Sequence, residues 1–334
     1  MNKLLKVVTI GGGTGSYVVL MGLKKYPLKL TAIVTMADSG GSSGKLRDEL
    51  GVLPPGDIRQ CLVALSESSR LLREMFNYRF EAGGLQGHNF GNIFLSTLEK
   101  KTGSLKKAIA EVGKILRIRG KVVPVTFSKS DLCVELEDGT KIVGETHIDV
   151  VEKMEKRAKI IKANLYPKAK INEDAKTAIE DADFILIGPG DLYTSIIPNL
   201  LVGGMAKAIK NSRAKKIFVL NLMTKYGQTT YYSAKDHVKD LEKYLGKGII
   251  DFILINSKMP KGKTLLWYKQ FEEYPVKDDL ENPKSYQIFR KNLIRDFLIS
   301  ESASDELRRS IIRHDSLKLA KEIMEIIENS STKT

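Results

Sequence analysis

The sequence predicts an α/β fold with a Rossmann-like, mostly parallel sheet, helices on both faces and an inserted antiparallel β segment. Short apolar runs alternate with helix-compatible stretches along the chain, as in successive βαβ units. Five of these runs end in turns that contain Gly, Asp or Asn. Ligands of open parallel sheets bind outside the carboxyl ends of the strands, so these turns also predict where a ligand site lies.

The first βαβ unit lies at the start of the chain. Residues 4–10 form an apolar run that ends in glycines, and a helix-compatible stretch follows over 16–25. Pro27 ends this helix, and a second apolar run covers 30–36. The same pattern resumes later, with predicted strands over 184–187, 217–220 and 252–255 and a final helix over 316–328.

The segment from about 121 to 150 has a different pattern. Its apolar residues are spaced as in short strands, and Asp138-Gly139 between two of them is typical of a hairpin turn. We expect an antiparallel insertion over 121–150, followed over 151–170 by a linker and a short helix. The whole chain, residues 1–334, is expected to form a single domain.

The composition is that of a globular protein, with 42% hydrophobic and 28% charged residues among 334. Two cysteines, Cys61 and Cys133, are too few for a disulfide framework or a four-ligand zinc site. The formal charge of +14 predicts a lysine-rich solvated surface and an attraction to anionic ligands. No helix-turn-helix, zinc-finger, RRM or KH signature is present, so a nucleic-acid partner is not expected.

The longest uncharged stretch covers residues 192–206, and it contains Pro198 and two glycines. It does not have the pattern of a membrane span. The apolar run before Gly11 is too short for the core of a signal peptide. We therefore expect a cytoplasmic protein.

The first glycine turn is Gly11-Gly12-Gly13-Thr14-Gly15. Without side chains, its backbone can approach a phosphate, and the N–H groups at the start of the next helix point toward that phosphate. The alternative is a turn whose glycines serve only strand-to-helix packing. Four glycines exceed what one tight turn needs, which favours anion binding.

The second turn, after residues 30–36, begins with Asp38. It lies 23 residues after Gly15, close to the spacing of the ribose-binding acid in dinucleotide folds. Asp38 is therefore a candidate for a ribose hydroxyl, for a Mg²⁺ ion on a diphosphate or for a helix N-cap. Ser39, Gly40, Gly41 and Ser42 follow it in a loop suited to wrapping a phosphate or a sugar.

Further polar residues follow the later turns. Arg59 is either a phosphate ligand or a surface arginine. His88 stands with two asparagines, and no second histidine at i+4 supports a zinc site. No motif identifies a nucleophile, so no catalytic residue is predicted. The remaining candidate ligand contacts of these turns are Asn89, Asn92, Gly188, Gly190, Asn221 and Thr224.

Taken together and in order, these motifs resemble one family, the gluconeogenesis factors (YvcK) of the CofD-like superfamily. The segments that carry the resemblance span most of the chain; they are 11–15, 36–44, 50–59, 88–92, 188–201, 221–224 and 313–315. The resemblance implies a Rossmann-like core, a cytoplasmic location and binding of a UDP-sugar, notably UDP-N-acetylglucosamine, with no required cofactor. It also implies a role in cell shape and envelope growth on gluconeogenic carbon sources.

The resemblance leaves the chemistry and the ligand open. The CofD branch transfers a phospholactyl group from a nucleotide diphosphate donor with magnesium, so catalysis is undecided. NAD and GTP remain alternative ligands, and a homo-oligomer is compatible with the sequence. Within the resemblance, Tyr268 is assigned to stacking on uracil or a sugar, with core packing beside Trp267 as the alternative. Arg313 is assigned to the diphosphate.

Overall fold

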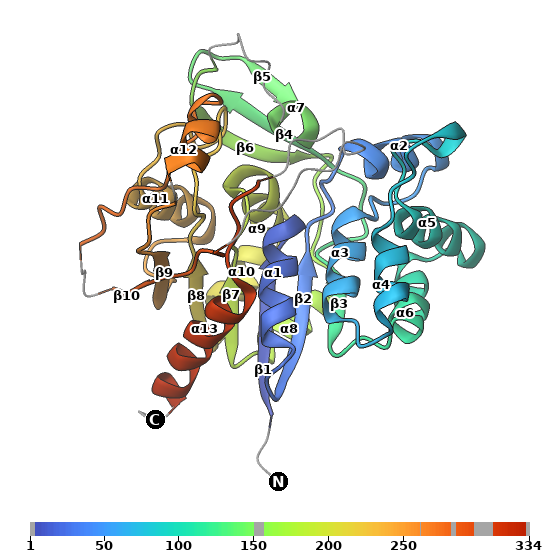
Figure 1. The fold of residues 1–334 in the computed structure, drawn as a ribbon, viewed down its shortest axis with the longest axis horizontal. Coiled ribbons are helices and arrows are strands. Elements are labelled where there is room, and N and C mark those ends of the chain that lie inside the picture. Colours follow the sequence, from blue (N-terminus) through green and yellow to red (C-terminus); the bar gives the residue numbers. More distant parts are fainter. Residues whose placement is uncertain (1–3, 150–156, 261, 282–284, 297–309, 332–334) are drawn as a thin grey trace.

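The computed structural model of the protein describes residues 4–149, 157–260, 262–281, 285–296 and 310–331. A seven-stranded sheet forms its centre, with the strand order β10-β9-β8-β7-β1-β2-β3, and all of its pairs are parallel (Figure 1). The prediction of a mostly parallel sheet is confirmed. The strands are β1 (Leu5–Gly11), β2 (Leu28–Val34), β3 (Lys121–Pro124), β7 (Phe184–Ile187), β8 (Lys215–Val219), β9 (Phe252–Asn256) and β10 (Gln287–Lys291).

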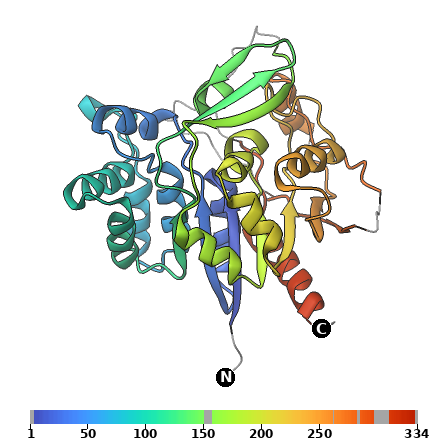
Figure 2. The ribbon, with the colours of Figure 1, turned by 180° about the vertical axis from the view of Figure 1, so that it is seen from behind.

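Helices cover both faces of this sheet, as predicted. The helices α1 (Gly13–Leu23), α3 (Gly56–Leu65) and α13 (Ser316–Ser331) pack together on the face seen in Figure 1. The helices α8 (Glu173–Glu180), α10 (Met205–Asn211) and α11 (Ala234–Leu245) lie on the opposite face, seen in Figure 2. The strands between them are mainly apolar, and all four residues of β7 are buried.

The remaining helices flank the core. Between β2 and β3 the chain forms α2 (Gly41–Leu50), α4 (Arg70–Asn77), a 3₁₀ turn (Gly83–Leu85), α5 (Phe90–Thr102) and α6 (Leu105–Ile115). A π-helical turn (Leu192–Ile196), α9 (Ile197–Leu201) and α12 (Gly262–Lys269) belong to the second half. None of the helices that the structure describes is long and apolar enough to cross a bilayer.

The inserted antiparallel segment exists, but its boundaries differ from the prediction. β3 starts at residue 121 and pairs in parallel with β2, so it belongs to the main sheet. The separate three-stranded sheet consists of β5 (Lys141–Val143), β4 (Asp131–Leu136) and β6 (Ile160–Tyr166), and α7 (Glu145–Asp149) follows β5. The predicted linker and helix over 151–170 therefore contain β6 instead, and residues 151–156 lie outside the described residues.

The reason for this error lies in the local patterns. Both β3 and β4 are short runs that contain buried apolar residues, and the sequence does not show which partner each run pairs with. β6 alternates buried and exposed positions, and its exposed positions include Lys162 and Asn164, which made the segment read as a polar linker. The predicted hairpin at Asp138-Gly139 is confirmed, because β4 and β5 pair antiparallel around it and Gly139 has a φ of 85°.

The contact between α1 and α13 leads to a stability prediction. A Cβ at Gly22 would lie 2.0 Å from the carbonyl oxygen of Ser316 and 2.7 Å from Cβ of Ala320. We expect Gly22→Ala to force the two helices apart and to lower the free energy of unfolding by about 1–3 kcal/mol. Gly84→Ala is the matched control, since nothing lies within 4 Å of its Cβ position. Urea unfolding checks this; equal midpoints for Gly22→Ala and the wild type would contradict the packing argument.

Candidate functional site

A cavity of about 190 Å³ opens at the carboxyl edge of the sheet. Its walls come from the turn after β1, the loop that leads into α2, the start of α3, the turn after β7 and the loop after β8. The strand order reverses between β1 and β7, so the cavity lies where two neighbouring connections leave the sheet in opposite directions. This is the place where open α/β sheets bind their ligands.

Two glycines of the first turn make close backbone contacts that no larger residue permits. A Cβ at Gly15 would lie 2.0 Å from the carbonyl oxygen of Pro189, and one at Gly12 would lie 2.2 Å from Oδ2 of Asp57. The turn after β1 therefore packs directly on the turn after β7 and on the first turn of α3. The predicted proximity of the two glycine turns is confirmed.

Three helix N-termini face this cavity, and none has a side-chain cap. Their N-cap residues are Gly12 for α1, Gly40 for α2 and Pro55 for α3. Five other helices are capped by a side chain, namely those that begin after Ser69, Asn89, Ser104, Asn172 and Ser233. Uncapped first turns keep N–H groups available, and the helix dipoles add a positive potential. The arrangement suits an anion.

Six carboxylates and four cations also line the cavity. Burial raises the pKa of Glu145 well above its usual range, and the neighbouring Asp38 and Asp149 carboxylates raise it further. Burial likewise raises the pKa of Asp191 to about 6. The acids are Asp38, Asp57, Glu145, Asp149, Asp191 and Glu273, and the cations are Arg59, Arg79, Lys225 and Arg313.

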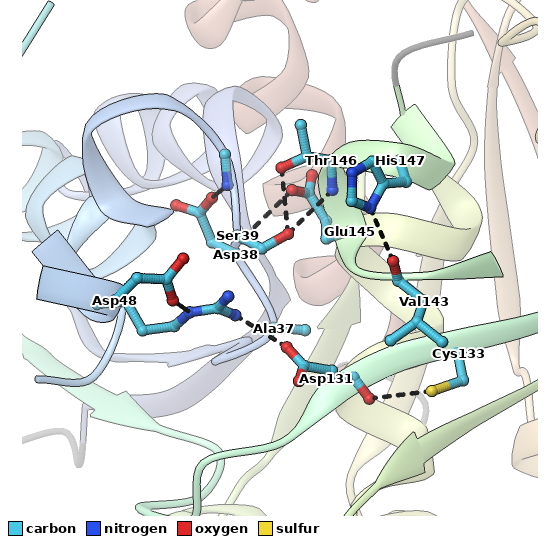
Figure 3. A network of polar contacts seen from close by, with 12 residues as sticks. Ala37, Asp38, Ser39, Asp48, Asp131, Cys133, Val143, Glu145, Thr146 and His147 are labelled. Atoms are coloured by element: carbon cyan, nitrogen blue, oxygen red, sulfur yellow. Dashed lines mark hydrogen bonds and ion pairs between the residues drawn. The ribbon is translucent and has the colours of Figure 1, made fainter. Parts of the chain in front are cut away.

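The inserted sheet contributes one wall of the cavity through α7. Ser39 Oγ lies 3.1 Å from Oγ1 of Thr146 and accepts the Thr146 N–H at 3.0 Å (Figure 3). The backbone N–H of Ser39 points to Oε2 of Glu145 at 3.4 Å. This places the Glu145 carboxylate beside Asp38 (Figure 3).

The other end of α7 is bound to the loop after β8. Oδ1 of Asp149 accepts a hydrogen bond of 2.8 Å from Nε2 of Gln228 and lies 3.5 Å from Nζ of Lys225. α7 therefore joins the two sides of the cleft, because its first turn contacts the loop before α2 and its last residue contacts the second half of the sheet.

The cavity brings together fourteen of the twenty predicted ligand contacts. These are Gly12, Gly13, Thr14, Gly15, Asp38, Gly40, Gly41, Ser42, Arg59, Asn92, Gly190, Asn221, Thr224 and Arg313. The six that do not line it are Gly11, Ser39, His88, Asn89, Gly188 and Tyr268. Three of these support residues that do: Ser39 holds α7, His88 Nδ1 lies 3.4 Å from Ser42 Oγ, and Asn89 caps α5. Gly11 accepts a hydrogen bond from Asn199, which lies outside the cavity lining.

Tyr268 does not present a ring face to the cavity. The side chain is 1% exposed, and its ring packs edge-to-face against Trp267 with the centroids 4.8 Å apart. Its hydroxyl accepts the backbone N–H of Ile312 at 3.0 Å. The geometry thus agrees with the packing alternative, and it gives Tyr268 a second role in holding the segment that carries Arg313.

Arg59 is a buried residue, so the surface alternative is wrong. Its exposed fraction is 8%. Nε donates to Oδ1 of Asn92 at 2.9 Å, and Nη1 donates to Oδ1 of Asn77 at 2.5 Å. These bonds fix the guanidinium in the cavity wall beside the first turn of α3.

Sequence reasoning missed several residues of the cavity. Asp57 stands in the first turn of α3, where an acid after Pro-Pro-Gly is a signal that was available. Glu145 and Asp149 come from the insertion, and no local pattern shows that α7 reaches the cleft. Burial lowers the pKa of His314 to about 4, so this cavity residue has a neutral ring at pH 7.

The fold and the cleft define a Rossmann-like α/β protein whose glycine turns and uncapped helices meet in one cavity. A sequence profile described as 2-phospho-L-lactate transferase CofD matches residues 7–294. Gluconeogenesis factors from Halalkalibacterium halodurans and Bacillus subtilis are 42% and 39% identical over 325 and 329 residues. These matches cover 97% and 98% of this chain and 97% and 100% of the relatives.

Solved structures agree. A UPF0052 family member from Bacillus halodurans matches with a TM-score of 0.88 at 40% identity, covering 97% of this chain and 100% of that one. The chain therefore belongs to the CofD/UPF0052 family, among the gluconeogenesis factors.

The raised pKa of Asp191 predicts a pH-dependent stability. Its pKa is about 6 in the folded protein against 3.8 for the free side chain, so folding favours the protonated form. The stabilisation is complete below about pH 3.8 and is lost as the pH rises through 6. The stability of Asp191→Asn relative to the wild type should thus rise from about pH 3.8 to about pH 6 and stay level above it, a gain of up to about 3 kcal/mol.

Urea unfolding at a series of pH values measures this difference. Asp174→Asn is the control, because Asp174 is an exposed carboxylate on α8 and its removal changes the net charge equally. Its ion pair with Lys106 is also exposed and therefore contributes little to stability. If the free energies of unfolding of Asp191→Asn and the wild type differ by the same amount at every pH, the raised pKa of Asp191 is contradicted.

Proposed function

We propose that the cleft binds a nucleotide diphosphate sugar, with UDP-N-acetylglucosamine as the first choice, and that the protein acts as a sensor of this metabolite. The single observation that carries the proposal is the convergence of three uncapped helix N-termini and a glycine turn on one cavity. Such an arrangement suits a diphosphate. The relatives are named gluconeogenesis factors, which supports a role in growth on gluconeogenic carbon sources. A cytoplasmic function in envelope growth and cell shape is part of the same proposal.

The size of the cavity limits how the ligand lies. A volume of about 190 Å³ is below the roughly 300–1,000 Å³ of sites that enclose a drug-sized ligand. We infer that the diphosphate occupies the cavity between the start of α1 and Arg313, and that the base and the sugar extend beyond it. The carboxylates of α7 would then meet ligand hydroxyls, which donate hydrogen bonds, better than phosphate oxygens.

A Mg²⁺ ion fits this arrangement as part of the ligand. Carboxylate oxygens are the protein ligands that Mg²⁺ prefers, and it keeps several positions for phosphate oxygens and water. Among the described residues, no group of three or more His, Cys, Asp or Glu side chains is placed to hold an ion. Asp38 would therefore supply one ligand, the diphosphate would supply others, and the ion would reduce the repulsion between the phosphates and the acidic wall.

A transferase function like that of the CofD branch is the second candidate. It is favoured by the family profile and by the carboxylates around Asp38. Magnesium-dependent release of nucleotide from GTP or UDP donors, in the presence of acceptors, would distinguish the two. Sustained release that Asp38→Asn abolishes would replace the sensor by the transferase, and no release would leave the sensor.

The first prediction for the ligand concerns stability. A ligand that binds only the folded protein raises the free energy of unfolding by RT ln(1 + [L]/Kd), or about 2.7 kcal/mol at a concentration of 100 Kd. We expect UDP-N-acetylglucosamine to shift the melting temperature more than UDP, NAD or GTP does. Thermal melts and calorimetric titration with the four ligands test this. A larger shift with NAD or GTP would change the ligand class, and no shift with any of them would contradict the proposal.

The second prediction concerns Arg313. Its Nε donates to the carbonyl of Ser310 at 3.0 Å, and the residue lines the cavity. Loss of a charge-assisted contact costs about 1.5–3 kcal/mol, so Arg313→Ala should weaken UDP-sugar binding about tenfold or more. Arg313→Lys should recover only part, because an ammonium lacks the planar fork.

Melting curves of the ligand-free variants provide the control for Arg313. If the arginine serves the ligand, the ligand-free proteins melt at nearly the same temperature as the wild type. If it mainly holds the 310–313 segment, ligand-free Arg313→Ala melts earlier, and the assignment to the diphosphate fails. Arg70→Ala, which removes an exposed arginine of α4, should change neither the affinity for the UDP-sugar nor the melting temperature of the ligand-free protein.

A further inference from the structure

A second and larger cavity, of about 1090 Å³, lies on the other side of the molecule from α1 and α3. It is a groove over β1, β2 and β3, and its walls are α6 and α8 (Figure 2 shows the face of the sheet on which α8 lies). On β1 and β2 the lining residues belong to the amino-terminal halves of the strands, whereas the nucleotide cleft lies beyond their carboxyl ends; β3 lines the groove along its whole length. The two sites share no lining residue.

The floor of this groove carries lysines on three neighbouring strands. Lys6 of β1 is the register partner of Lys29 of β2, and Lys121 of β3 is the register partner of Thr31 of β2. Lys29 and Thr31 are two residues apart, so their side chains share one face of the sheet. The three lysines therefore lie together on that face. Like charges on directly opposed strand residues destabilise a sheet, and the ion pair of Lys6 with Asp181 offsets part of this cost.

The walls add to the positive charge. Six cations line the groove against two carboxylates. Both carboxylates are paired, Asp181 with Lys6 at 2.9 Å and Asp174 with Lys106 at 2.5 Å. Among the described residues no ion pair is recorded for Lys29, Lys121 or Arg117. Arg117 is held at the rim by the end of α6: it has a φ of 49°, and the N–H groups of Arg117 and Ile118 bond to the carbonyls of Lys114 and Gly113, as at an ordinary helix C-terminus.

The groove also has apolar lining residues, and it lies where a crossover helix would cover the sheet in many α/β proteins. Phe127 is 40% exposed at its carboxyl end, and Ile118 and Ala178 are half-buried along its walls. In doubly covered α/β sheets each crossover helix fills the space above a pair of strands. The chain after β3 enters the inserted sheet instead, so this face of β2 and β3 has α6 and α8 only at its sides.

We propose that this groove is a docking site for an acidic amphipathic helix of a partner protein. The apolar side of such a helix would contact Phe127, Ile118 and Ala178, and its carboxylates would pair with Lys29, Lys121 and Arg117. The charge of the groove selects an acidic partner, and the space between α6 and α8 selects a helix. The inference does not depend on the nucleotide site, because the two sites have no residue in common.

The test uses fluorescence anisotropy with the whole protein and three synthetic peptides of equal length. One is an amphipathic helix of leucine and glutamate, one has lysine in place of glutamate, and one has the first composition in a scrambled order. We expect the acidic helix alone to bind. Lys29→Glu/Lys121→Glu should weaken it about tenfold or more, as expected for the loss of charge-assisted contacts. Phe127→Ala should weaken it as well, which a purely electrostatic contact would not show.

Lys235→Glu/Lys239→Glu on α11 is the matched control, because it makes the same change of net charge on exposed lysines outside the groove. It should leave peptide binding within about twofold, a difference too small to report a lost charge-assisted contact. Circular dichroism melts confirm that both double variants are folded. Equal weakening by the control, or equal binding of the scrambled peptide, would overturn the proposal.

Competition assays with RNA and with anionic vesicles decide between partner classes. If a single-stranded RNA oligonucleotide or phosphatidylglycerol vesicles bind more tightly than the peptide and depend on the same lysines, the groove serves that class and the helix proposal fails. In cells, a photo-crosslinking residue at position 31 should then join the protein to an acidic helical segment. A crosslink to RNA or lipid instead would also refute the proposal.

Discussion

The close contact between the turn after β1 and the turn after β7 is the constraint on which the site depends. Gly15 lies against the carbonyl of Pro189, and any side chain at position 15 would separate the two turns. Because these strands are neighbours at the point where the strand order reverses, the contact fixes the start of α1 relative to the second half of the sheet. The first turn of α3 is fixed to the same turn, since a Cβ at Gly12 would lie 2.2 Å from Oδ2 of Asp57.

A second constraint is the balance of charge in the cleft. An anion there gains from the helix N-termini and the arginines, but it also faces six carboxylates. Burial raises the pKa of Glu145 and of Asp191, and neighbouring carboxylates raise both further. α7 carries two of these acids into the cleft and is held at both ends by hydrogen bonds to loops of the core. The inserted sheet is thus part of the site, and whatever binds must neutralise or hydrogen-bond its acidic residues.

The central sheet and the edge that carries the ligand site were predictable from the sequence. Strands that are buried on both faces appear as short apolar runs, and each of these runs ends in a turn with Gly, Asp or Asn. The apolar runs before Gly11, Asp38 and Gly188 became β1, β2 and β7, and their turns face one cavity. The contributions of α7 were not predictable, since they depend on how a separate sheet docks. The orientation of Tyr268 was not predictable for a related reason. The neighbouring sequence, which includes Trp267, does not show whether the ring faces a ligand or packs in the core.

The two candidate sites share the strands β1 and β2 but use opposite ends of them. β1 has seven residues, so its ends are roughly 20 Å apart at about 3.3 Å per residue. A ligand at the carboxyl end and a helix in the basic groove could therefore be bound together without contact. Lys6 and Gly11 stand on one rigid strand, and any influence of one site on the other must pass through the packing of the flanking helices. A ligand in the cleft can change the hydrogen bonds that join α7 to the loop before α2 and to the loop after β8, whereas it leaves the hydrogen bonds between the strands unchanged.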